Sequence, residues 1–255
     1  MANFECFVQQ YPLIFNNSDI PDSWKPLLGS VFSCSQCPTV FDQMLLGNPL
    51  DNIALALKDD FDWFPKSDTL WSFTKLCRPE DVKVVIVGQD PSDASATGLA
   101  FSKDVGEGIY QSTETILEEV RNDIGEHNLR PFPEDYGNLD YWAKQGVLLL
   151  NSALTKSPHK SHLEIGWKTI VAELIKQLQQ INKNIVFVFW GWHAMLLSHN
   201  VEYDDWNKLV TGHPSKNNEK NDFLGCRHFS NANRRLIKYG IEPIDWCPLP
   251  PKNIS

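Results

Sequence analysis

Four short runs of apolar residues, rich in Val, Ile, Leu and Phe, stand out along the chain. They occupy residues 83–87, 146–150, 185–190 and, with a weaker pattern, 208–211. Continuous apolar runs of this length are typical of strands that are buried on both faces, as in a parallel sheet. The pattern therefore predicts four strands at the centre of the fold.

Amphipathic segments lie between these runs. Apolar residues recur at helical spacing over residues 167–181, and a second stripe covers residues 116–124. The second stripe follows Ser112, which is predicted to cap the helix, with an acidic first turn after it. A last helix is predicted to end at Gly240. Strands that alternate with helices indicate an α/β fold with a central four-stranded, mostly parallel sheet flanked by helices.

Length and composition are those of one globular domain. The chain has 255 residues, of which 42% are hydrophobic and 22% charged. Residues 1–22 are expected to form a poorly specified N-terminal arm, and residues 23–255 a single domain. The start of the chain does not resemble a signal peptide, and no apolar run reaches the ~18 residues of a membrane span. We therefore expect no membrane partner and a cytoplasmic location in a bacterial or viral context, or a nuclear one in a eukaryote.

Net charge and cysteine content limit the kinds of binding site that we expect. The net charge of −9 disfavours indiscriminate binding to nucleic-acid phosphates, so a nucleic-acid site would have to be a local groove. The six cysteines fit reduced thiols, and Cys34 and Cys37 form a CxxC pair without a second pair at zinc spacing. A metal or redox role for this pair is the less favoured alternative. Because phosphate-binding motifs such as GxGxxG are absent, we expect no nucleotide cofactor. No other cofactor and no metal site are predicted.

Polar side chains follow the predicted strands at the point where each strand ends. Gln89 and Asp90 come after the first strand, Asn151 ends the second, Gly191 follows the third and His213 the fourth. In open α/β sheets, ligands bind at the edge formed by the carboxyl ends of the strands. Each residue alone is explained by a turn, but four such strand ends together favour a shared site.

These strand ends carry motifs that resemble the uracil-DNA glycosylase family. The most specific stretches are residues 82–91 (VKVVIVGQDP), 142–151 (WAKQGVLLLN) and 212–215 (GHPS). Residues 225–230 (GCRHFS) and 243–246 (PIDW) support them. The motifs occur in the order of the family, and the resemblance extends over nearly the whole chain.

The resemblance implies a monofunctional DNA N-glycosylase, which hydrolyses the bond between sugar and base of an extruded pyrimidine. It implies that Asp90 positions water and stabilises the sugar cation, and that His213 donates a hydrogen bond to O2 of the departing base. The implied base-binding residues are Gln89, Ser92, Phe101 and Asn151. Residues implied to hold the DNA backbone or to form the wedge loop are Ser112, Gly191, Trp192, Ser215, Lys216 and Asn217. The expected partner is DNA, double- or single-stranded, bound by a monomer.

The chain departs from the family where the base is selected. The family has Tyr-His after Gln-Asp-Pro, whereas this chain has Ser92 and Asp93, followed by a shorter loop. That Tyr excludes thymine by its bulk against C5 of the base, so a Ser is expected to leave this side of the slot open. An Asp near DNA phosphates should weaken binding unless a new partner offsets its charge.

The loop that enters the duplex differs as well. Lys216 and Asn217 replace the Pro-Leu of the family, so the apolar wedge is missing. Trp192 lies where the family has a phosphate-binding Ser, and it either stacks on a nucleotide or packs in the core. Packing is favoured for an isolated Trp. The Pro-rich loop that precedes Ser112 in the family is replaced by residues 105–108 (VGEG).

Three functions stay open from the sequence. The favoured one is a DNA glycosylase for C5-modified pyrimidines, such as glucosylated hydroxymethyl bases of phages, in a defence role. Ordinary uracil excision in DNA repair and a non-catalytic DNA-binding role are the alternatives. Asn151 does not decide between uracil-type and cytosine-type bases, because its amide can be turned over.

Overall fold

The four predicted strands lie side by side in one sheet. The structure, a computed structural model, describes residues 4–35, 47–201 and 205–252. Within them the strands are β1 (Val84–Gly88), β2 (Val147–Asn151), β3 (Val186–Trp190) and β4 (Lys208–Thr211). All neighbours pair in parallel, in the order β2-β1-β3-β4. The predicted α/β class with a four-stranded sheet is confirmed. Cys37, and with it the CxxC pair, lies outside the described residues.

Helices precede and connect the strands. Before β1 the chain forms α1 (Phe4–Gln10), α2 (Pro12–Phe15), α3 (Lys25–Ser35), α5 (Pro49–Lys58) and α6 (Ser67–Leu70). The later helices are α7 (Gln111–Val120), α8 (Asp140–Lys144), α9 (Lys168–Ile181), α10 (Trp192–Leu197) and α11 (His228–Lys238). None of the helices in the described part of the chain is long and apolar enough to cross a membrane.

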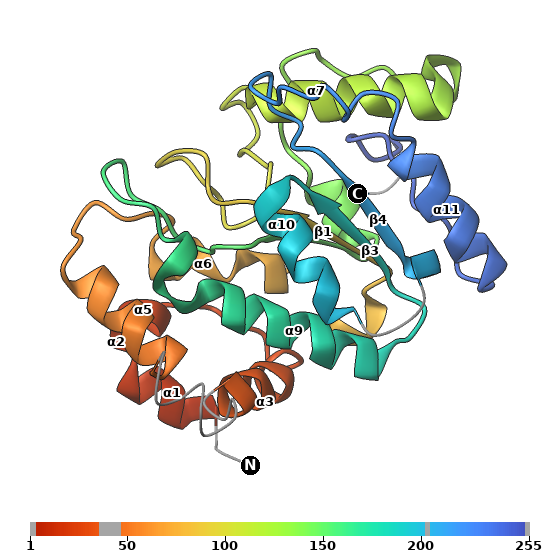
Figure 1. Cartoon of the computed structure of the whole chain (residues 1–255). Coiled ribbons are helices and arrows are strands. Elements are labelled where there is room, and N and C mark those ends of the chain that lie inside the picture. The colour runs from red at the N-terminus through yellow and green to blue at the C-terminus, as the bar shows by residue number, and fades with distance from the viewer. Residues whose placement is uncertain (1–3, 36–46, 202–204, 253–255) are drawn as a thin grey trace.

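The sheet is covered by helices on both faces. Figure 1 shows α9, α3 and α1 on one side of the sheet, and α7 and α11 on the other. Val85 and Val87 of β1 belong to the first core, which includes α9, whereas Val84 and Ile86 belong to the second, which includes α7 and α11. Both faces of β1 are therefore buried, which explains its continuous apolar run.

The N-terminal segment differs from the arm expected from the sequence. Phe7, Ile14 and Phe15 are buried in the first core, and the ring of Phe15 stacks on Trp71 with centroids 5.3 Å apart. α1 and α2 are too short to be stable alone, and their apolar side chains become buried only by packing on the rest of the fold. Residues 4–22 are thus an integral layer of this structure.

The predicted helices are present, with one boundary that moves. α9 occupies the stripe expected at residues 167–181, and α11 ends just before Gly240, whose φ is +71°. The prediction of Ser112 as helix cap is wrong. Tyr110 precedes the helix and its carbonyl accepts the N–H of Glu114 (2.9 Å), so Ser112 already lies in the first turn of α7.

Candidate active site

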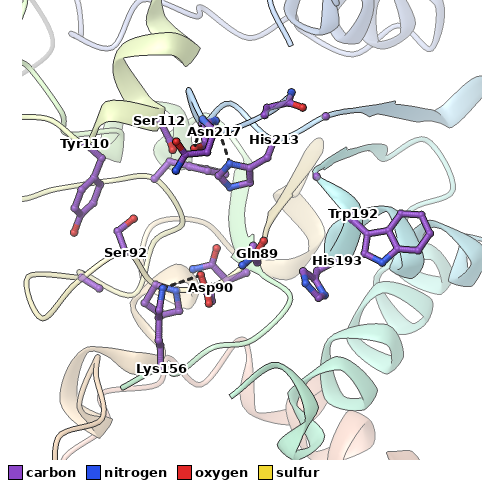
Figure 2. Close-up of a pocket in the computed structure, with 18 of the residues that line it drawn as sticks. Gln89, Asp90, Ser92, Tyr110, Ser112, Lys156, Trp192, His193, His213 and Asn217 are labelled. Carbon is purple, nitrogen blue, oxygen red and sulfur yellow. Dashed lines mark hydrogen bonds and ion pairs between the residues drawn. The ribbon is translucent and has the colours of Figure 1, made fainter. Parts of the chain in front are cut away.

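A pocket of about 1020 Å³ opens at the carboxyl edge of the sheet, where the four strands end (Figure 2). It gathers almost all of the residues that the sequence singled out, although these lie far apart along the chain. The predicted site residues that line it are Gln89, Asp90, Ser92, Phe101, Ser112, Asn151, Gly191, Trp192, His213, Ser215 and Asn217. Lys216 is not among the lining residues, and its ammonium lies 3.9 Å from the carboxylate of Glu114.

Asp90 is the second residue after β1, and its carboxylate lines the pocket. Its side chain is 11% exposed, and its Oδ1 lies 3.4 Å from Nζ of Lys156. Lys156 is held by two backbone hydrogen bonds with Phe64, of 2.9 and 2.8 Å. Lys156 thus places a positive charge beside Asp90 from a separate segment, a partner that sequence reasoning missed.

Phe101 and Asn151 meet across the last residue of β1. A Cβ atom on Gly88 would lie 2.7 Å from the Phe101 ring and 2.8 Å from Oδ1 of Asn151, so only a glycine leaves room for both side chains. Phe101 itself has a positive φ of +66°, an unfavourable conformation for a side chain of this size. The ring and the amide therefore form a tightly built slot, with a flat apolar surface beside a donor and an acceptor.

The backbone of Gln89 bonds to the segment that follows β2. Its carbonyl accepts the N–H of Ala153 (3.0 Å), and the carbonyl of Gly88 accepts both the N–H and the hydroxyl of Ser152. These bonds tie the end of β1 to the segment after β2. They hold the strand ends that carry Asp90 and Asn151 next to each other.

His213 lies half-buried beside Gly191, which follows β3. The N–H of Ser215 donates to its Nδ1 (3.1 Å), so Nδ1 is the acceptor and a neutral ring carries its proton on Nε2. Burial lowers the pKa of His213 below its ordinary value of 6.5, although Asp90 acts in the opposite direction. Gly191, with φ of +92°, allows this close approach, since a Cβ there would lie 3.1 Å from Cβ of His213. At neutral pH His213 is thus a neutral donor.

Trp192 differs from its sequence interpretation. It begins α10 and is 65% exposed, so the expectation that it packs in the core is wrong. His193 beside it also lines the pocket, and its buried Nδ1 has no hydrogen-bond partner among the described residues. A flat apolar ring thus stands exposed at the mouth of the pocket.

The loop after His213 is polar throughout. Residues 216–222 contain no apolar side chain. The hydroxyl of Ser215 accepts the N–H of Asn217 (3.1 Å), and the amide of Asn218 donates to Asp222 (2.8 Å). The loop is ordered by hydrogen bonds at the rim of the pocket, and it presents no apolar wedge.

Comparison with known proteins gives one family. A sequence model of the uracil DNA glycosylase superfamily matches residues 74–237. Uracil-DNA glycosylase 1 of Bacteroides fragilis is 39% identical over 186 residues, which cover 71% of this chain and 82% of that protein. Uracil-DNA glycosylase of Homo sapiens is 39% identical over 190 residues, covering 73% of this chain and 59% of the human protein.

Solved structures give the same fold. The crystal structure of mimivirus uracil-DNA glycosylase matches with a TM-score of 0.69 and covers 94% of this chain and 99% of that one, at 24% identity. The enzyme from Nitratifractor salsuginis matches with a TM-score of 0.55 at 17% identity. The two structures thus share the fold of this chain.

Proposed function

The chain belongs to the uracil-DNA glycosylase superfamily and is a monofunctional DNA N-glycosylase, and we propose that its substrates are uracil and C5-substituted pyrimidines in DNA. The proposal combines two observations. The relatives are named uracil-DNA glycosylases, and the pocket has an exposed serine where the family has a tyrosine.

Asp90 and His213 are the proposed catalytic residues. The carboxylate of Asp90 stabilises the positive charge that develops on the sugar and takes a proton from the attacking water. The glycosidic bond breaks, and the electron pair of that bond leaves with the base. A new bond forms between C1′ and the oxygen of the water. His213, neutral and protonated on Nε2, donates to O2 of the base, where negative charge develops.

Phe101 and Asn151 are the proposed base-binding side chains. The Phe101 ring offers a stacking surface, and the Asn151 amide offers one donor and one acceptor to the pyrimidine edge. The loop after His213 has no apolar wedge to push the base out of the duplex. Extrusion would therefore depend on how easily the base unstacks and on contacts between the DNA and residues at the pocket mouth.

Uracil is the substrate that the comparisons favour. The expectation from the sequence put a modified pyrimidine first and uracil repair second, and the names of the relatives support the second more than the first. An open slot does not exclude uracil, because the smaller base fits wherever a larger one does. Base-excision repair is therefore part of the proposed function.

The proposal that C5-substituted pyrimidines are substrates rests on a single observation. Ser92 is exposed and lines the pocket, so no tyrosine ring extends from this position to close the C5 side. A size filter of one methyl group is worth only ~1–3 kcal/mol, so its loss readily widens the range of substrates. If the additional substrate is a modified phage base that is absent from the DNA of the host, its excision would damage the phage and spare the host. The wider substrate range would then act in defence.

The net charge of −9 means that the proposed DNA binding needs local groups that hold phosphates without a positive charge. We propose that Ser112 and Ser215 hold phosphates through their hydroxyl groups, which need no positive charge. Gly191, whose N–H donates to the carbonyl of Thr211 (3.0 Å), lets the backbone come close to the DNA at this point. Trp192 stacks on a nucleotide at the pocket mouth, and Lys216 and Asn217 lie against the duplex. The protein acts as a monomer where the DNA is, in the cytoplasm or, in a eukaryote, in the nucleus.

Counting abasic sites in defined DNA tests the proposal. Duplexes and single strands that carry uracil, thymine, 5-hydroxymethylcytosine or its glucosylated form are incubated with the protein and with Asp90→Asn. We expect release of uracil and of at least one substituted base, and loss of both in Asp90→Asn, with Asp59→Asn on the exposed surface as the control. Release of uracil alone would refute the wider range, and full activity of Asp90→Asn would refute its catalytic role.

A further inference from the structure

Two segments that depart from the family meet in space. Asp93 lies in the loop after β1, and Tyr110 immediately precedes α7 and follows the replaced residues 105–108. The hydroxyl of Tyr110 donates to Oδ1 of Asp93 (3.2 Å). Ser95 donates to the same oxygen through its N–H (2.9 Å) and its hydroxyl (2.5 Å). We call Ser92, Asp93, Ser95 and Tyr110 the polar rim.

The polar rim lies at the side of the pocket from which the family tyrosine is missing. Ser92 and Tyr110 both line the pocket. Figure 2 shows them together on one side, with Trp192 on the opposite side and Asp90 between. A substituent that leaves the base slot past Ser92 therefore meets the hydroxyl of Ser92 and the ring of Tyr110. Asp93 and Ser95, both exposed, lie next to them outside the pocket lining, around the hydroxyl of Tyr110.

We propose that the polar rim is a binding site for an uncharged, hydroxyl-bearing substituent on C5 of the pyrimidine, such as a hydroxymethyl group or a sugar. The inference rests on the proposed function and specifies its substrate class. It goes beyond an open slot, because an open slot admits any substituent of the right size, whereas the rim selects by hydrogen bonding.

The charge of the rim supports this class of ligand. Burial alone would raise the pKa of Asp93, but the hydrogen bonds from Ser95 and Tyr110 outweigh it and lower the pKa. Burial raises the pKa of Tyr110 to about 12, so its hydroxyl keeps its proton. An ionised carboxylate accepts hydrogen bonds from hydroxyl groups and repels anions. The rim therefore suits a neutral polyol and disfavours a phosphorylated or carboxylated substituent.

The rim also has the rigidity that recognition needs. The ammonium of Lys103 lies 4.6 Å from the centre of the Tyr110 ring, and Asp93 holds the other end of this side chain by its hydroxyl. These two contacts hold the Tyr110 side chain in place, so little of its freedom is lost on binding. Aromatic surface beside fixed hydrogen-bonding groups gives both contact area and direction to a bound sugar ring.

Rates of base release on matched duplexes test the proposal. The substrates carry uracil, thymine, 5-hydroxymethylcytosine or its glucosylated form, and the readout is the rate for each substituted base divided by the rate for uracil. The wild-type protein is expected to release the hydroxylated bases faster than thymine. Asp93→Ala and Tyr110→Phe are expected to lower the ratio for the hydroxylated bases by about tenfold, since each removes one side of the hydrogen bond between Tyr110 and the ionised Asp93.

Glu107→Gln, an exposed acidic residue in the neighbouring segment, is the matched control and should keep the wild-type ratio. Unchanged ratios in both rim variants, while the wild type releases the hydroxylated bases, would refute the rim and leave the proposed function standing. Release of uracil alone by the wild type would refute the rim together with the wider substrate range. Equal release of thymine and the hydroxylated bases would show that the slot selects by size.

Discussion

The ammonium of Lys156 lies 3.4 Å from Oδ1 of Asp90, and both side chains line the same pocket. The backbone of Lys156 is fixed by its pairing with Phe64, so the ammonium reaches Asp90 from a rigid base. The contact fixes one oxygen of the proposed catalytic carboxylate.

Lys156→Met is expected to slow base release by about two- to fivefold, because a partly exposed ion pair contributes about 0.4–1 kcal/mol. Single-turnover release of uracil measures the effect, and Lys156→Arg should restore most of the rate by keeping the charge. Lys160→Met, an exposed lysine of the same loop, serves as the control. An unchanged rate in Lys156→Met would show that Asp90 needs no such partner.

The protonation of His213 gives a prediction on pH. Burial lowers its pKa below 6.5, so the neutral ring persists as the pH falls through 6.5 and is lost only at more acid pH. Protonation would put a second N–H on Nδ1, facing the N–H of Ser215. We expect the acid limb of uracil release below pH 6.5, together with a ¹⁵N signal of Nδ1 typical of an acceptor at pH 7. A midpoint above 6.5 in the nitrogen titration would contradict the neutral ring.

Gly88→Ala tests the tightness of the base slot. The added Cβ would lie within 3 Å of both the Phe101 ring and the Asn151 oxygen, so at least one of them has to move. We expect base release to fall by about tenfold or more, since an error of 1 Å in such a site is costly. Thermal unfolding should still show one cooperative transition. Full activity in a folded Gly88→Ala protein would mean that Phe101 and Asn151 do not hold the base.

Trp192→Ala tests the exposed ring at the pocket mouth. Because the side chain is 65% exposed, its removal should leave the stability nearly unchanged. If the ring stacks on a nucleotide, affinity for DNA should fall by about fivefold or more. Fluorescence anisotropy with labelled DNA measures it, and Phe61→Ala, at an aromatic side chain that is 86% exposed, is the control. If Trp192→Ala binds DNA as tightly as Phe61→Ala does, Trp192 has no role in DNA binding.

Much of the fold follows from local patterns. The strands β1 to β4 coincide with the four apolar runs within one residue. The signal is clearest for β1, β2 and β3, where burial on both faces removes the polar alternation, and weaker for β4, whose Val210 is exposed. Asp90, Asn151 and His213 meet in one pocket because the carboxyl ends of parallel strands lie at the same edge of the sheet. The N-terminal helices escaped prediction because short helices depend on packing partners far along the chain.

The sequence by itself determined the sheet, the edge that holds the site and the chemistry of its strand-end residues, since these depend on local periodicity and on a fixed rule of parallel sheets. Only the tertiary structure decided that Lys156 faces Asp90, that Tyr110 is tied to Asp93 beside Ser92 and that Trp192 is exposed. Such contacts join segments that are distant in the sequence, and no local pattern in either segment indicates the other. They arise where loops and helix ends pack, and this packing depends on the whole fold.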